Sequence, residues 1–172
     1  MLELQQTDII TQAAKTSLAA ALALALAGWV QLPEPYWAAI SAIMVMQSDI
    51  AVLQSTSLNR LAGTAIGALV GACAVSFWGL NGWSFPLAVF CSSLICAVIG
   101  RWETYRFAGV TVAIVMLVTH HGTPWIVGLH RFLEVSFGII VAFVITFLSQ
   151  KWVNRSSRHV SQTRRRFPRK AG

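Results

Sequence analysis

Apolar residues gather into six long runs along the chain, separated by short polar or turn-forming stretches. The runs cover residues 13–31, 36–53, 60–79, 84–100, 107–120 and 131–150. A bilayer's hydrocarbon is about 30 Å thick and needs about 20 residues of helix to cross it. The pattern therefore predicts an all-α, polytopic membrane bundle of six transmembrane helices within residues 13–150, after an N-terminal cytoplasmic segment at residues 1–12.

Composition supports a membrane protein. Hydrophobic residues make up 56% of the chain and charged residues 11%, whereas soluble domains carry about a quarter of charged residues. No room remains for a soluble catalytic domain, and no nucleophile, base and orienting group converge, so an enzyme is not expected. Cys73, Cys91 and Cys96 lie in apolar runs without metal-ligand spacing. We read them as packing residues and expect neither a metal nor another cofactor.

Basic residues give the expected orientation, because cytoplasmic loops hold the excess of Lys and Arg. With both termini cytoplasmic, the outer side carries Arg131 alone. The inner side then carries Lys15, Arg60, Arg101, Arg106 and the eight basic residues of 151–172. We expect this tail to be disordered and to bind lipid headgroups or hold the topology, not to bind nucleic acid. A cleaved signal peptide ending at Ala25-Leu26-Ala27 is the alternative, disfavoured because Glu3 and Asp8 outnumber Lys15 before it.

Two apolar segments of the chain have similar sequences. "WAAISAIMVM" at 37–46 is echoed by "FAGVTVAIVM" at 107–116, with three of ten positions identical. The third and sixth runs extend the echo, since Arg60, Gly67 and Val70 are matched by Arg131, Gly138 and Val141. Three crossings per copy would place the second copy upside down, which predicts a 3+3 inverted repeat as in transporters. Two similar apolar helices without functional symmetry are the simpler alternative.

The third run contains a stripe of small residues, Gly63, Gly67 and Gly71, spaced four apart. Such stripes let transmembrane helices approach closely, so we expect helix packing within one subunit or between subunits. A glycine-lined substrate path is the alternative.

Ionisable residues at membrane depth are candidates for function because they are costly there. Asp49 stands near the inner end of the second run, where Lys15 and Arg60 could join it; a structural ion pair at the interface is the alternative. A second group lies at the outer side and comprises His120, His121, His130, Arg131 and Glu134. Histidine titrates near neutrality, so this group could accept protons for a proton-driven exporter, or could be solvated loop-end residues.

The stretch from Pro35 to Ala72 resembles the fusaric acid resistance protein family, also called the aromatic acid exporter family. Its matching features are Tyr36 and Trp37, the polar patch 47–49, and Arg60 followed by Gly63, Thr64, Gly67 and Gly71. The resemblance implies a bacterial inner-membrane transporter that expels aromatic or other organic carboxylates. Two features depart from the family: Ser48-Asp49 replaces its usual Pro, and many members have two six-helix units where this chain has one. The single unit suggests a homodimer.

These observations lead to one functional hypothesis and two alternatives. A homodimer exports small organic anions: Arg60 and Arg131 attract the carboxylate, and Tyr36 and Trp37 contact its ring. Asp49, His120 and Glu134 are the candidates for proton coupling. The alternatives are a passive organic-anion channel, since plant aluminium-activated malate channels resemble this family distantly, and a non-transporting membrane scaffold.

Overall fold

The computed structural model describes the backbone of residues 2–47, 49–118 and 123–166, and side chains between Ile9 and Lys151 outside the same gaps. Over these residues the chain is all-helical, with no strand. The helices are α1 (Leu2–Trp29), α2 (Tyr36–Val45), α3 (Ile50–Trp78), α4 (Ser84–Val98), α5 (Tyr105–Ala113) and α6 (Pro124–Arg166). A 3-10 turn, η1 (Trp102–Thr104), precedes α5, and a π-helical turn, η2 (Ile114–Val118), follows it. The predicted all-α class is therefore confirmed.

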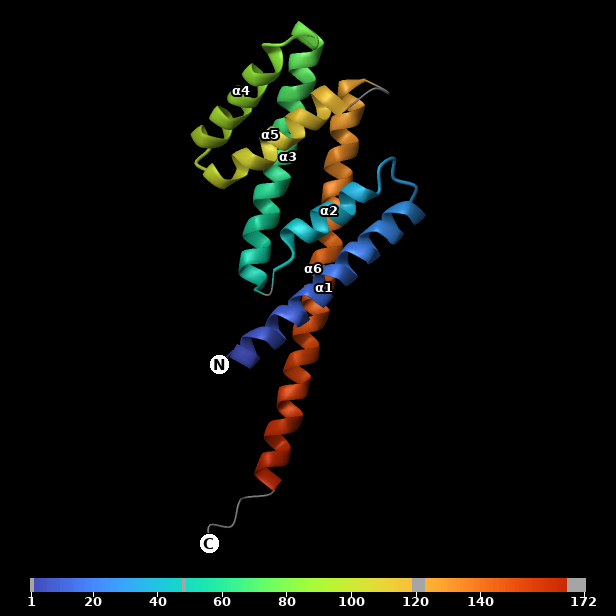
Figure 1. Cartoon of the computed structure of the whole chain (residues 1–172), viewed down its shortest axis with the longest axis vertical. Coiled ribbons are helices and arrows are strands. Elements are labelled where there is room, and N and C mark those ends of the chain that lie inside the picture. The colour runs from blue at the N-terminus through green and yellow to red at the C-terminus, as the bar shows by residue number, and fades with distance from the viewer. Residues whose placement is uncertain (1, 48, 119–122, 167–172) are drawn as a thin grey trace.

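Helices α3 and α6 pack together and run in opposite directions (Figure 1). Each carries a pair of helices. α4 and α5 pack on each other and on α3, whereas α1 and α2 pack on each other and on α6. The chain thus forms two three-helix groups that meet along the α3–α6 contact.

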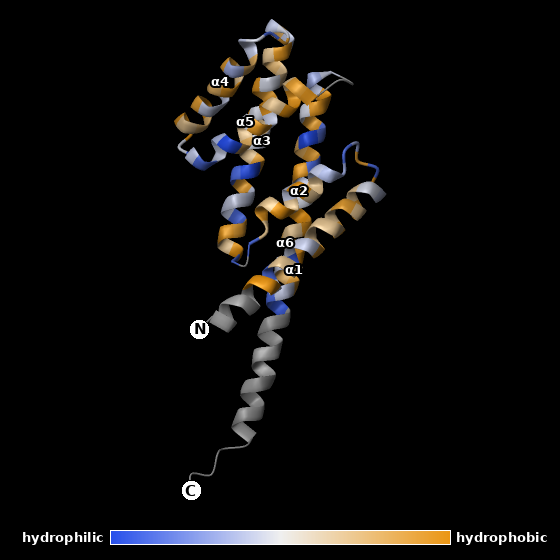
Figure 2. Cartoon of the chain, viewed as in Figure 1, coloured by the Kyte–Doolittle hydropathy of each residue, from blue (hydrophilic) through white to orange (hydrophobic). Residues whose placement is uncertain are grey.

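Helix α1 buries small residues against its neighbours and exposes large apolar residues on the outer surface of the bundle. Ala19, Ala23 and Ala27 recur every four residues, lie on one face and are fully buried against α2 and α6. Leucines on the other faces are exposed, and so are Trp29, Phe77 and Val98 at about four-fifths of their surface. Figure 2 shows the same apolar colouring along the helices and polar colouring at several connections. Small residues inside and large apolar ones outside are typical of helices packed within lipid.

Three helical stretches are long and apolar enough to cross a membrane: Ile9–Trp29, Ile50–Trp78 and Pro124–Lys151. The apolar helices Tyr36–Val45 and Ser84–Val98 are shorter. At 1.5 Å per residue, α2 is about 15 Å long, roughly half the hydrocarbon thickness. Over the described residues the chain therefore has six α-helices, and only three stretches of them reach spanning length.

The second predicted helix ends early. The sequence pattern predicted 36–53, but α2 ends at Val45, and Met46 is already extended (φ −60°, ψ 118°). A new helix starts at Ile50, where the Asp49 carboxylate caps it by accepting from the Ala51 N–H at 2.8 Å. The polar stretch 54–59, which the pattern places between two helices, belongs to α3. Polar side chains such as Ser55 are tolerated there because they bond to the helix's own carbonyls.

The first, fifth and sixth helices also have bounds that differ from the predicted ones. The sixth helix begins at Pro124 and not at 131, because proline suits the first position of a helix. It continues through residues 151–166, so the expectation of a disordered tail is wrong over that range; no Gly or Pro interrupts it there. The first helix likewise extends back to Leu2. The fifth, predicted at 107–120, divides into α5 and η2, and residues 119–122 lie outside the described part.

Candidate functional site: two buried arginines

Arg131 lies in the second turn of α6 and is only 4% exposed. Its Nη1 donates to the Glu134 carboxylate at 2.9 Å, and its Nη2 donates to the Glu34 carboxylate. Glu134 is fully buried and stands three residues further along the same helix face. The guanidinium therefore bridges two carboxylates, and the three groups together carry a net charge of −1 when ionised.

Glu34 comes from the α1–α2 connection, between Pro33 and Pro35. Its backbone N–H donates to Glu134 at 2.9 Å, and its carboxylate accepts from the Trp37 indole N–H at 2.9 Å and from the Tyr36 hydroxyl. Burial raises the pKa of this carboxyl, but hydrogen bonds from Tyr36 and Arg131 outweigh that effect and leave its pKa below the ordinary value. These contacts hold the connection against α6.

Trp37 completes the Arg131 cluster, which comprises Arg131, Glu34, Glu134 and Trp37. The Arg131 guanidinium stacks over the Trp37 ring, 4.7 Å from the ring centroid. The buried Arg131 Nε has no hydrogen-bond partner among the described residues. The chain's own glutamates thus hold both Nη atoms of this guanidinium, so an external carboxylate that paired with those two atoms would have to displace them.

Arg60 lies in α3 and is also 4% exposed, but its surroundings differ. Its Nε and Nη2 donate to the Ser41 hydroxyl at 3.3 and 3.1 Å, and that hydroxyl donates to the Trp37 carbonyl at 2.7 Å. The guanidinium stacks over the Phe107 ring, 5.2 Å from its centroid. Among the described residues no carboxylate forms an ion pair with Arg60.

A buried hydroxyl stands beside Arg60 on the same helix face. Ser57 precedes Arg60 by three residues, is 2% exposed, and its Oγ has no hydrogen-bond partner within the described part of the chain. Burying an unpaired hydroxyl costs roughly 1–3 kcal/mol. Among the described residues, Arg60 thus lacks a carboxylate partner and Ser57 lacks a hydrogen-bond partner, and an oxyanion could satisfy both groups.

Each arginine is followed, seven residues later on its helix, by a glycine at a close helix crossing. A methyl group added at Gly67 of α3 would lie 2.3 Å from the Ala108 carbonyl oxygen and 2.8 Å from the Thr111 Cβ of α5. One added at Gly138 of α6 would lie 2.2 Å from the Ala38 carbonyl oxygen and 2.8 Å from the Ser41 Cβ of α2. Both glycines therefore allow backbone-to-backbone contact with a crossing helix.

The remaining candidates from the sequence occupy other places. Asp49 is exposed at the start of α3, and neither Lys15 nor Arg60 forms an ion pair with it among the described residues. Gly63 faces α5, where an added methyl group would lie 2.6 Å from the Phe107 Cβ, and Gly71 faces η2, where it would lie 3.2 Å from the Val115 Cβ. His120 lies outside the described residues.

Sequence reasoning missed Glu34 and Ser41. Glu34 could have been noticed as a lone acid between two prolines, directly before the Tyr36-Trp37 pair. Ser41 stands inside an apolar helix and offered no signal of its own.

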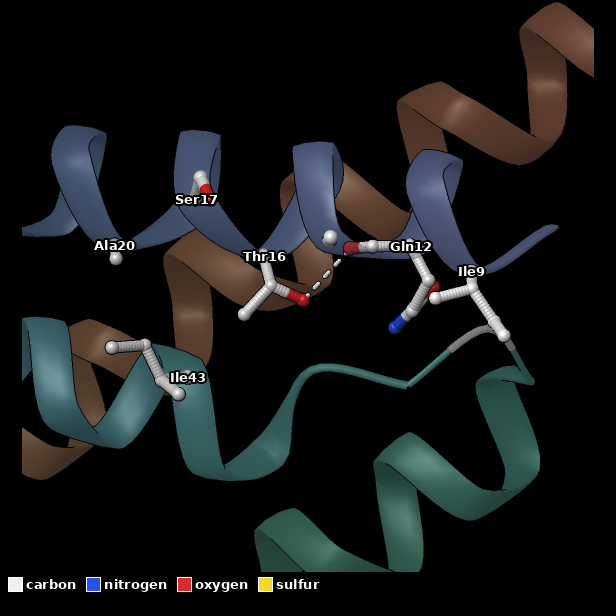
Figure 3. Close-up of a pocket in the computed structure, with 7 residues that line it drawn as sticks. Ile9, Gln12, Thr16, Ser17, Ala20 and Ile43 are labelled. Atoms are coloured by element: carbon white, nitrogen blue, oxygen red, sulfur yellow. Dashed lines mark hydrogen bonds between the residues drawn. The ribbon is translucent and has the colours of Figure 1, made fainter. Parts of the chain in front are cut away.

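One open groove is lined by residues that include neither arginine. It has a volume of about 740 Å³ and runs between α1 and α2. Figure 3 shows Gln12 and Thr16 of α1 above Ile43 of α2, with the Thr16 hydroxyl bonded to the Gln12 carbonyl at 2.9 Å. Its described lining residues are apolar or uncharged polar ones.

Comparisons with known proteins address the family. Residues 20–145 match the family described as fusaric acid resistance protein-like. The uncharacterized transporter YdhK of Escherichia coli K12 is 32% identical over 139 residues, covering 74% of this chain and 21% of that protein. The uncharacterized protein C57A7.05 of Schizosaccharomyces pombe is 28% identical over 152 residues, covering 72% of this chain and 11% of that protein.

The chain spans about a fifth or less of the length of these relatives. No solved structure matches it. The family match covers most of the membrane helices and includes Arg60, Arg131 and the glycines beside them. The chain belongs to the fusaric acid resistance protein-like family.

Proposed function

We propose that this chain is a membrane transporter unit that moves small organic carboxylates outward across the bacterial inner membrane. The family, the relative named as a transporter and the long apolar helices support membrane transport. The substrate class is our proposal, and one observation carries it: Arg60 is buried in a spanning helix without a carboxylate partner among the described residues.

An unpaired guanidinium at this depth is costly. Insertion into the membrane centre costs about 2.5–3.5 kcal/mol for an arginine, and removing one partner of a buried ion pair costs about 3–5 kcal/mol. A carboxylate ligand would supply the missing charge to Arg60 and a partner to the Ser57 hydroxyl. Arg131 meets the same need internally through Glu34 and Glu134, so the contrast between the two arginines favours Arg60 as the ligand's site.

We also propose that α1–α3 and α4–α6 are the two copies of an inverted repeat. Each three-helix group then combines the first two helices of one copy with the third helix of the other. Several matched contacts support it: Arg60 stacks on Phe107 as Arg131 stacks on Trp37, and Gly67 meets α5 as Gly138 meets α2. The opposite directions of α3 and α6 agree with it (Figure 1). Exchange of conformation between such halves would expose a central site to each side in turn.

Proton coupling and assembly complete the proposal. Protonation of Glu134 would weaken its ion pair with Arg131 and free the α1–α2 connection, while Asp49 and His120 remain candidates for the same role. Both termini would be cytoplasmic, and the unit would work as a homodimer. An uncoupler separates this exporter from a passive channel, whose flux would survive collapse of the proton gradient.

Flux of radiolabelled benzoate into proteoliposomes tests the role of Arg60. Arg60→Gln should lower the flux about tenfold or more, because it removes a charge-assisted contact of about 1.5–3 kcal/mol. Arg60→Lys should retain part of it. The control is Arg101→Gln, an exposed arginine whose loss should leave the flux unchanged. Wild-type flux in a well-folded Arg60→Gln protein would refute the proposal.

A further inference from the structure

A second cavity lies beside the Arg60 site. It has a volume of about 480 Å³, within the range of small-molecule sites. Its walls come from α2, α3, η1 and α5, with the lining residues Met44, Thr56, Asn59, Trp102, Glu103, Tyr105, Arg106, Phe107 and Val110. We infer that this cavity receives the ring of an aromatic carboxylate and that Trp102 and Phe107 determine the preference for aromatic substrates, an inference that rests on the proposed transport function.

Phe107 connects the cavity with Arg60. Its side chain lines the cavity, and its ring also lies under the Arg60 guanidinium at 5.2 Å from the centroid. Asn59, the chain neighbour of Arg60, lines the cavity as well. Phe107 is therefore shared by the cavity and the Arg60 site, and a ligand stacked on its ring would lie next to the residue that contacts the guanidinium.

The lining favours a flat ring over an aliphatic chain. Three aromatic side chains contribute to it, and Trp102 and Tyr105 form a tilted pair with centroids 5.3 Å apart. Offset and edge-to-face contacts between aromatic rings are worth more than their buried area alone. Trp102 is 69% exposed, so its indole stands at the mouth of the cavity with surface left for a ligand.

The charges on and near the lining orient the ligand. Arg106 and Glu103 are both exposed and cancel in net charge. The Glu103 carboxylate accepts from the Asn59 amide at 3.3 Å, while Arg106 stacks on the Tyr105 ring and donates to its hydroxyl at 3.2 Å. Because these two charges cancel, the net attraction on a ligand carboxylate comes from Arg60, whose guanidinium lies over the Phe107 ring. The ring therefore occupies the cavity and the carboxylate points to Arg60.

Two variants of the full chain test this placement by the ratio of two fluxes in proteoliposomes. Benzoate is the aromatic probe and propionate the aliphatic one. Trp102→Ala should lower benzoate flux about tenfold and leave propionate flux within about twofold. Phe107→Leu also removes the ring under Arg60, so it should lower both fluxes, and benzoate flux more than propionate flux. The matched control is Trp125→Ala, because Trp125 is also exposed but lines a different groove, between α3 and α6. It should change neither flux.

The possible outcomes separate the two proposals. Equal loss of both substrates in Trp102→Ala, or no loss of either, overturns the ring site while Arg60-dependent flux still stands. Wild-type flux of both substrates in Arg60→Gln overturns the transport proposal itself. Trp102 is so exposed that its variant should fold even if Phe107→Leu does not, and a single symmetric peak in size-exclusion chromatography checks this.

Discussion

Adding one methyl group at Gly67 or at Gly138 should force a helix crossing apart. The new Cβ would lie 2.3 Å from the Ala108 oxygen in the first case and 2.2 Å from the Ala38 oxygen in the second. Carbon–oxygen contacts begin at about 3.3 Å, so each pair of helices must separate by about 1 Å. Overpacking typically costs about 1–3 kcal/mol, and a backbone carbonyl cannot move aside as a side chain can.

Because the obstacle is backbone, we take the upper end of that range, about 3 kcal/mol, and subtract about 1 kcal/mol gained from the better helix propensity of alanine. The expected net loss is about 2 kcal/mol for each variant. In a chain of this size that loss lowers the Tm by about 4–8 °C. Alanine at two other glycines gives smaller expected losses of stability for comparison. Gly71→Ala meets only the Val115 side chain at 3.2 Å and should lose less, whereas Gly28→Ala meets nothing within 4 Å and should be neutral or stabilising.

The assay is thermal unfolding in detergent, followed by the fraction of protein that stays monodisperse after heating. The order of stability should be Gly28→Ala, then Gly71→Ala, then Gly67→Ala and Gly138→Ala together at the bottom. If Gly138→Ala is as stable as Gly28→Ala, the close contact of α2 with α6 is not as described.

Two further predictions concern the Arg131 cluster. Arg131→Met should lower the free energy of unfolding by about 3–5 kcal/mol, because it leaves the buried Glu134 carboxylate without its cation; a loss under about 1 kcal/mol, no larger than that of the exposed Arg101→Met control, would contradict this. Because the pKa of Glu34 lies below its ordinary value of 4.5, its stabilising contribution is complete above that pH and is lost as the pH falls through the lowered pKa. The Tm of the wild type should therefore drop more steeply below pH 4.5 than that of Glu34→Gln, and parallel curves would argue against the pairing.

The sequence predicted helices best where apolar residues and turn signals agreed. The fourth run was predicted at 84–100 and the structure has α4 at Ser84–Val98, with Gly100 in a left-handed conformation just beyond it. The sequence prediction failed at 54–59, where polar residues continue a helix, and at 124–130, where a helix begins at a proline and runs on through Gly128. Polarity marks a loop only when the residues also break the backbone, and Ser, Thr and Gln do not.

The site was predictable only in its local part. Arg131 and Glu134 are three residues apart, so their pairing follows from helix geometry. Glu34 is 97 residues away from Arg131, and its position depends on how the α1–α2 connection folds back over α6. Ser41 reaches Arg60 only because Gly138 lets α2 lie close to α6 and turn that face inward. Such contacts depend on packing that no local pattern encodes.

The different surroundings of the two arginines follow from one glycine. Under the proposed repeat, Gly63 corresponds to Glu134 and Thr104 corresponds to Glu34. A side chain at Gly63 would begin 2.6 Å from the Phe107 Cβ and 2.7 Å from the Thr104 oxygen, so no carboxylate can stand there while α3 lies this close to α5. The close contact that brings Phe107 under Arg60 thus also denies Arg60 an internal counter-ion. If the transport proposal holds, that charge is the one left for the substrate, whereas the charge of Arg131 serves to hold the α1–α2 connection on α6.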